Sequence, residues 1–168
     1  MKLTSIFLKE LQKESKVTRK MLERVPSEKF DWKAHPKSMS VKEVASHIAE
    51  LAGWIPMVLS TEELDFASMD YKLPEINSTD DLMNLLNSNI DMAESFLKPD
   101  NEEKLSQIWV LRSGETIHSK ETKAEVIRMV FNQITHHRAQ LGVYLRLLDI
   151  PIPATYGPSA DDTEFGSI

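Results

Sequence analysis

The sequence predicts an all-α protein, a single domain over residues 1–168 in which four helices pack as a bundle. Four stretches repeat apolar residues at the three- and four-residue intervals of an amphipathic helix. Proline and glycine separate these stretches, and there is little β-alternation anywhere. A helix with one apolar face must bury that face against another element, and four such helices do so most simply as a bundle.

The first two predicted helices cover residues 2–24 and 40–59. The first ends before Pro26, and its face opposite the apolar stripe is charged and is expected to be solvated. The second begins at Ser40, where Glu43 three residues later makes a capping box. Pro56 is expected to kink or end it. The apolar stripes are Leu3, Phe7, Leu11, Val17, Met21 and Leu22 in the first helix, and Val44, Ile48, Leu51 and Ile55 in the second.

The last two predicted helices cover residues 79–98 and 122–149. The third follows a second capping pair, Ser78 and Asp81, and ends before Pro99. The long connection before it, residues 60–77, would let two neighbouring helices run in the same direction. Proline cannot continue the fourth helix, so residues 151–168 are expected to lie extended over the bundle.

Between the third and fourth helices, residues 105–118 break the helical pattern. Trp109, Val110 and Leu111 form a short apolar run, and a turn is expected at Ser113-Gly114. This segment is predicted to be a short hairpin or an irregular strand pair.

Composition narrows the classes of function. A net charge of −6 with a pI of about 5.4 disfavours binding to nucleic acid or to anionic membranes. No segment approaches 18 uninterrupted apolar residues, and no signal-peptide pattern opens the chain, so we expect a cytoplasmic protein. The absence of cysteine excludes disulfides, a thiolate nucleophile and cysteine-ligated zinc. A metal would have to bind histidine, carboxylate, amide or water ligands.

Two polar side chains fall inside the apolar arc of the fourth helix, Gln133 and His137. Burying an amide or an imidazole without a partner costs about 1–3 kcal/mol, so each needs a hydrogen bond, a water or a metal. The i, i+4 spacing is the one used when a helix gives two ligands to one ion. A hydrogen-bonded core amide and a hydrogen-bonded core histidine are the alternative interpretation.

His47 is the best candidate for a third ligand, because it lies midway along the second helix. It falls at the edge of that helix's apolar stripe, beside Trp54, where a pocket wall is expected. Facing helices of bundles commonly build metal sites from such inward side chains. Trp54 itself is expected to lie in the core or in the pocket wall.

Several other residues are candidates for neighbours of this site. His136 is one step of 100° from His137 and points to the flank, as a support for the site or as part of an interface. Arg138 and Gln140 would orient the site or be boundary residues of the helix face, and Tyr156 in the tail would close the pocket mouth or simply pack.

Four further residues are expected to lie outside the site. His35 precedes Pro36 in a loop, and His118 lies in the turn region. Glu43 and Glu50 flank His47 but are predicted to face the solvent, as glutamates on helices usually do.

Four segments, in order, carry a family resemblance that covers nearly the whole chain. They are residues 30–38, 43–50, 132–141 and 156–161, including Phe30-Asp31-Trp32, Ser46-His47, Asn132-Gln133, His136-His137-Arg138 and Tyr156-Gly157-Pro158. With these segments the chain resembles the DinB/YfiT-like family of small helical bundles. The family name is no evidence for action on DNA.

The resemblance implies an up-down-down-up four-helix bundle, often dimeric, with a divalent metal held by three histidines. The matching positions are His47, Gln133 and His137, so glutamine stands where the family usually has histidine. Ala139 also replaces a glycine that family members often show. An amide oxygen is a weaker ligand than imidazole for zinc or nickel, so we expect reduced metal affinity.

For function, the resemblance implies a metal-dependent transferase or hydrolase that uses a low-molecular-weight thiol such as bacillithiol or mycothiol. A bound metal would lower the pKa of a thiol or water. The alternative is a small-molecule-binding or stress-associated interaction module whose metal site has degenerated through Gln133. Nothing in the sequence identifies the substrate.

Overall fold

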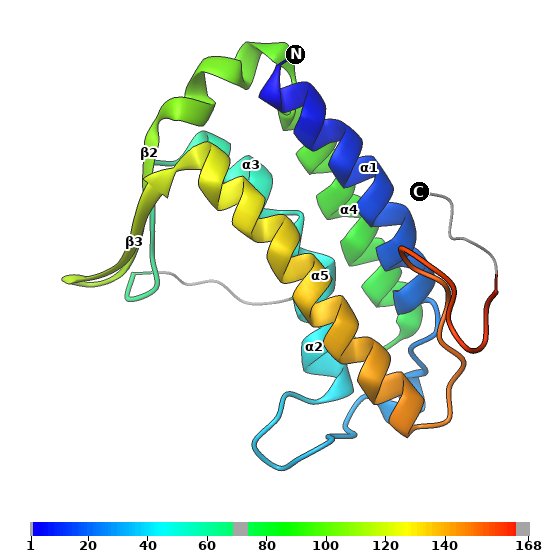
Figure 1. Ribbon diagram of the computed structural model, residues 1–168. Helices are drawn as coiled ribbons and strands as arrows, with labels where there is room; N and C mark the ends of the chain where they lie inside the picture. Colours follow the sequence, from blue (N-terminus) through cyan, green and yellow to red (C-terminus); the bar gives the residue numbers. More distant parts are fainter. Residues whose placement is uncertain (1, 69–73, 164–168) are drawn as a thin grey trace.

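The structure, a computed structural model, describes residues 2–68 and 74–163 and is mostly helical (Figure 1). Its α-helices are α1 (Leu3–Leu22), α2 (Val41–Leu51), α3 (Trp54–Ser60), α4 (Thr79–Phe96) and α5 (Lys123–Leu147), and two 3₁₀ segments are η1 (Ser27–Lys29) and η2 (Pro99–Ser106). Each predicted helix is therefore present, although the second is divided into α2 and α3.

Capping boxes start three of the helices. Ser40 Oγ accepts a hydrogen bond from the backbone N–H of Glu43 at 3.1 Å, and the Glu43 carboxylate accepts one from the Ser40 N–H at 2.6 Å. Ser78 and Asp81 repeat this pattern at the start of α4, as the sequence predicted. A third box, from the cap residue Thr122, opens α5. These local bonds satisfy N–H groups that a helix end would otherwise leave unpaired.

The second predicted helix breaks at Ala52-Gly53, three residues before the expected position at Pro56. Pro56 instead lies in the first turn of α3, where the missing N–H costs nothing. A Cβ on Gly53 would lie 2.5 Å from Asn89 Oδ1, so glycine permits the close approach of α4 at this break.

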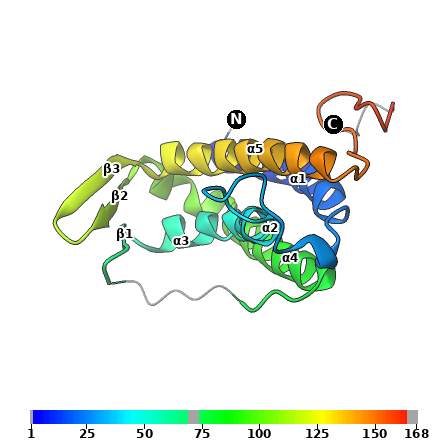
Figure 2. The ribbon, with the colours of Figure 1, turned by 90° about the horizontal axis from the view of Figure 1, so that it is seen from below.

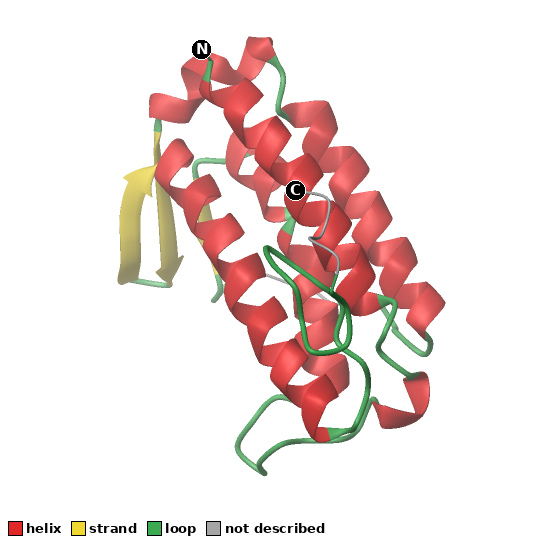
Figure 3. Cartoon of the chain, turned by 45° about the vertical axis from the view of Figure 1, so that its right-hand side comes forward, coloured by secondary structure: helices red, strands yellow, loops and turns green. Residues whose placement is uncertain are grey.

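The all-α expectation was wrong in one respect, because the chain also forms a three-stranded sheet (Figure 3). The predicted hairpin is present as β2 (Ile108–Ser113) and β3 (Thr116–Thr122), which pair antiparallel. The third strand, β1 (Glu63–Asp65), pairs parallel to β2. A strand of three residues has too little alternation to be recognised, and its partner lies far along the chain.

The helices pack around one core. α1 contacts α4 and α5, and α2 and α3 contact the same two helices from the other side. α2 and α4 run in the same direction. Lys42 and Asp81 interact electrostatically near the N-termini of the two helices, and further along both of them Asn89 Nδ2 donates a hydrogen bond to the Ala49 carbonyl at 3.1 Å. The long connection allows this parallel course. The largest fully buried side chains are Trp109, Phe131, Leu11, Leu22, Ile48, Ile55, Leu59, Leu82, Leu97, Ile127, Leu141 and Leu145.

The sheet and the C-terminal tail lie at opposite ends of the helices (Figure 2). The sheet adjoins the end of α3 and the start of α5, whereas the tail turns back beside the ends of α1 and α5. Within the described ranges, no helix is long and apolar enough to cross a membrane.

Candidate functional site

His47 of α2 and His137 of α5 meet face to edge between the two helices. Their ring centroids are 4.6 Å apart and the ring planes make an angle of 81°. The exposed His136 adds a third ring, 4.7 Å from that of His137. The structure thus brings together the two histidines that the sequence placed on separate helices.

Each of the two histidines is held through its Nδ1 atom. His47 Nδ1 lies 2.6 Å from Glu50 Oε1, and His137 Nδ1 lies 3.2 Å from Gln140 Oε1. Gln140 is itself fixed, because its Nε2 donates to the Tyr144 hydroxyl at 3.2 Å. With the proton on Nδ1, the Nε2 atom of each ring keeps its lone pair, which can bind a metal ion or accept a hydrogen bond.

The prediction that Glu50 faces the solvent was wrong. Only 13% of its side chain is exposed, and it contacts His47. Its position three residues after His47 was the available signal, since i and i+3 side chains are neighbours on a helix. Glu43, by contrast, caps α2 and leaves 55% of its side chain exposed. Gln140 contacts His137 through its Oε1 atom, and its predicted role in orienting the site stays a prediction.

A cavity of about 790 Å³ adjoins these groups. Trp54 lines it, and so do Phe66, Asn89 and Met129, none of which the sequence analysis had singled out. The described lining residues are His47, Glu50, Leu51, Gly53, Trp54, Met57, Phe66, Asn89, Leu111, Met129, Val130 and Gln133. Gln133 therefore shares a cavity wall with His47, whereas His137 lies outside this lining set.

The pKa of His137 lies below the usual 6.5. Burial is the main cause, since it penalises the charged imidazolium. The neighbouring rings of His47 and His136 lower the pKa further, and the hydrogen bond to Gln140 opposes them. His137 is consequently neutral at pH 7, the state in which an imidazole can bind a metal.

Comparisons with known proteins agree with this fold. The family model described as "DinB family" matches residues 1–165. The chain belongs to the DinB family. Crystal structures of two DinB-like proteins resemble it. Their sequence identity to this chain is low, so the likeness shows a shared fold and no more. The one from Bacillus subtilis has a TM-score of 0.68 and 19% identity, covering 85% of this chain and 92% of that one. The one from Bacillus cereus ATCC 10987 has a TM-score of 0.65 and 22% identity, covering 89% and 95%. No curated protein matches the chain.

The donor set of this DinB-family chain suits a divalent cation only in part. Two imidazoles and one amide oxygen are neutral ligands of acceptable chemistry for zinc or nickel. Across residues 2–68 and 74–163, however, no group of three or more His, Cys, Asp or Glu side chains is placed to hold a metal ion. Any third ligand beside His47 and His137 would therefore be of another type, and Gln133 is the candidate from the cavity wall.

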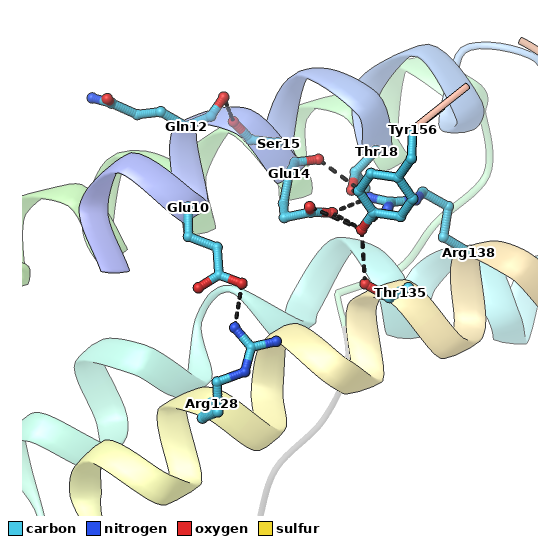
Figure 4. A network of polar contacts seen from close by, with 9 residues as sticks. All are labelled: Glu10, Gln12, Glu14, Ser15, Thr18, Arg128, Thr135, Arg138 and Tyr156. Carbon is cyan, nitrogen blue, oxygen red and sulfur yellow. Dashed lines mark hydrogen bonds and ion pairs between the residues drawn. The ribbon is translucent and has the colours of Figure 1, made fainter. Parts of the chain in front are cut away.

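Arg138 and Tyr156, two other predicted neighbours of the site, belong to a different cluster between α1, α5 and the tail (Figure 4). Arg138 is 2% exposed, and its Nη1 lies 2.8 Å from Glu14 Oε2. The Tyr156 hydroxyl accepts from Arg138 Nη2 at 2.7 Å and donates to the Glu14 carboxylate at 2.8 Å. Thr18 and Thr135 complete the network. Tyr156 does not close the pocket beside His47, because it lines another cavity.

That second cavity, of about 590 Å³, lies between α5 and the tail. Arg138, Val143, Arg146 and Tyr156 are among its lining residues. Arg146 also pairs with Asp161, which ties the tail to α5. One helix thus contributes to two cavities of different composition, with Gln133 lining the first and Arg138 lining the second.

Glu14 is a buried charge that was not predicted, since the polar face of the first helix was expected to be solvated. It is 9% exposed beneath the tail. The two remaining histidines lie elsewhere in the structure: His35 is exposed in the loop before α2, and His118 Nε2 lies 2.9 Å from Ser113 Oγ on the hairpin.

Proposed function

We propose that this DinB-family protein is a metal-dependent transferase or hydrolase in which His47, Gln133 and His137 bind one zinc or nickel ion beside the cavity. A low-molecular-weight thiol is the proposed co-substrate, by the family resemblance. One observation carries the proposal: two histidines from different helices meet at 4.6 Å, each with Nδ1 bonded to a neighbouring side chain.

The Nδ1 contacts support a metal-ligand role for the histidines. Metal-binding histidines almost always donate their other ring N–H to a carboxylate, a carbonyl or water, which fixes the ring and strengthens its donor nitrogen. Glu50 and Gln140 have this relation to His47 and His137. The lowered pKa of His137 supports the same role, since the ring need not lose a proton to bind a metal at pH 7.

A bound ion would act as a Lewis acid that lowers the pKa of a thiol or water molecule beside it. The chain's own residues have separate tasks in this proposal. His47 and His137 hold the ion, and the Gln133 amide oxygen adds a weaker third contact. Trp54 and the other apolar residues of the wall exclude bulk water.

The remaining family properties belong to the proposal as well. The parallel course of α2 and α4 supports the up-down-down-up four-helix bundle. A homodimer, a stress-associated role and a cytoplasmic location rest on the family resemblance and sequence composition, and they stay predictions.

A second function, a small-molecule-binding module without catalysis, is favoured by one observation. The described residues offer no cluster of three histidine, cysteine or acidic ligands, and Gln133 supplies only a neutral oxygen. In this alternative the cavity binds a ligand, and the histidine pair contributes hydrogen bonds alone.

A measurement of metal binding distinguishes the metal-dependent enzyme from the binding module. The protein, purified without an affinity tag, is analysed for metal content and then titrated with Zn²⁺ and Ni²⁺ by calorimetry. We expect about one ion per chain and its loss in both His47→Ala and His137→Ala, with helicity retained. His35→Ala is the matched control, because this exposed histidine lies in a loop.

Two results would overturn the metal-dependent function. One is a protein that binds none of the tested ions. The other is retention of the ion in both alanine variants, which would refute the ligand assignment and leave the binding module as the better account.

A further inference from the structure

The cavity beside His47 has the size of a small-molecule site. Its volume of about 790 Å³ falls inside the range of about 300–1,000 Å³ that is typical of ligand pockets. It lies where α2 and α3 face α5, with Asn89 contributed by α4 and Phe66 and Leu111 by the sheet region. Several elements therefore shape its wall, as in a preformed pocket.

The wall divides into an apolar and a polar part. The apolar part consists of two aromatic rings, two methionines and branched aliphatic groups: Trp54, Phe66, Met57, Met129, Leu51, Leu111 and Val130. The polar part consists of His47, Glu50, Asn89 and Gln133. A ligand that fits would place an aromatic or aliphatic body on the first part and a hydrogen-bonding group on the second. Methionine side chains adapt to the shape of such a body.

The charged groups in the wall of this cavity determine whether a charged ligand can bind there. Among the described lining residues, Glu50 carries the one carboxylate, and neither lysine nor arginine is present. An anion buried without a cationic partner loses much of its hydration energy. The second cavity differs, because Arg138 and Arg146 line it.

We propose that the cavity beside His47 binds an uncharged, mainly apolar small molecule with one hydrogen-bonding group, and that it discriminates against carboxylates, sulfonates and phosphates of the same skeleton. This inference rests on the proposed function in assigning the bound molecule as the substrate. It concerns the body of the ligand, and its binding is measured without a metal.

Two dyes with the same ring system test the charge selection. N-phenylnaphthylamine is uncharged, and anilinonaphthalene sulfonate adds one sulfonate; both become fluorescent in apolar sites. Each is titrated into the full chain in the presence of a chelator. We expect saturable binding of the neutral dye at one site per chain, and binding of the sulfonate at least about tenfold weaker.

Variants locate the dye. Met129→Trp places a larger side chain in the wall of this cavity and is expected to weaken binding of the neutral dye by about tenfold or more. Leu111→Trp fills it from the sheet and is expected to act in the same direction, so the test does not depend on one variant folding. Val143→Trp is the control, since Val143 is 59% exposed and lines the second cavity. Circular dichroism and thermal melting establish that each variant is folded.

Three results would overturn the inference: no saturable binding of the neutral dye, equal affinity for both dyes at a site sensitive to Met129→Trp, or loss of binding in Val143→Trp alone. Zn²⁺ titration of the same protein preparations, without the chelator, keeps the two proposals separate. Binding of the neutral dye by a chain that binds no metal would sustain the inference and refute the metal-dependent function. Metal binding without dye binding would do the reverse.

Discussion

His137 and Arg138 are adjacent in α5, yet their side chains belong to polar clusters of opposite character. Arg138 is buried and has three side-chain partners, the ion-pair partner Glu14 together with Thr18 and Tyr156. His137 is half-buried, bonded through one ring nitrogen and placed edge-on to His47.

The difference teaches how to separate structural from functional polar groups in this chain. Buried polar side chains must be paired, and a complete network fixes the elements that contribute to it. The Arg138 cluster joins α1, α5 and the tail in this way (Figure 4). The two histidines, by contrast, have Nε2 lone pairs that can still bind a metal ion, and they lie beside a cavity, which is where ligand binding is expected.

The largest expected effect comes from breaking the structural cluster. Arg138→Met leaves the Glu14 carboxylate buried without its cation and is predicted to lower the free energy of unfolding by about 3–5 kcal/mol. Urea denaturation measures this loss. The double variant Glu14→Leu/Arg138→Met removes both charges and should recover much of it. A single variant as stable as the wild type would show that the ion pair does not support the fold.

A smaller loss is expected for Tyr156→Phe. The variant keeps the ring that lies 5.2 Å from the Arg138 guanidinium but removes a hydroxyl bonded to Glu14, Arg138 and Thr135. Hydrogen bonds to charged groups suggest a cost of about 2 kcal/mol, read from the same urea curves. Zinc affinity should be unchanged. A marked loss of metal binding would mean that the two clusters are coupled.

Gln133→His acts on the other cluster. Replacing the amide oxygen by an imidazole nitrogen should tighten zinc binding by about tenfold, because imidazole is the better ligand for zinc. Calorimetric titration of folded variant and wild type provides the comparison, with His35→Ala as the reference for an exposed histidine. Unchanged or weaker affinity would show that residue 133 does not face the ion.

The smallest effect concerns pH. Because burial lowers the pKa of His137 in the folded chain, the unfolded chain takes up a proton below pH 6.5 that the folded chain resists. The contribution is complete above 6.5 and is lost as pH falls toward the folded pKa. We expect His137→Gln to flatten the decline in metal-free stability between about pH 7.5 and 5.5. Urea curves at several pH values measure it, and identical slopes would refute this role.

The sequence predicted the helices because the necessary signals are local. Apolar intervals of three and four residues, the caps at Ser40 and Ser78, and the prolines after the first and third helices all act within one or two turns. The same reasoning placed His47, Gln133 and His137 on inward or bordering positions of two helices. It missed β1, since a three-residue strand is stabilised by a distant partner rather than by its own pattern.

The partners of individual side chains could not be predicted in the same way. Glu50 and Glu14 both look like ordinary surface glutamates in the sequence, and both are largely covered. One turns toward a histidine on its own helix, while the other meets an arginine from α5. Helical periodicity gives the face on which a side chain lies, but not what another helix or the tail brings against it.

By itself, then, the sequence determined the helical segments and the identity of the three candidate ligands, because each depends on residue type and short-range spacing. Four segments in order along the chain carried the family resemblance. The tertiary structure alone decided that His47 meets His137, that Glu50 and Gln140 hold their rings, and that Arg138 and Tyr156 serve the fold on another side of α5. Those outcomes depend on helix packing and on the course of the tail, where contacts form between residues far apart in the chain.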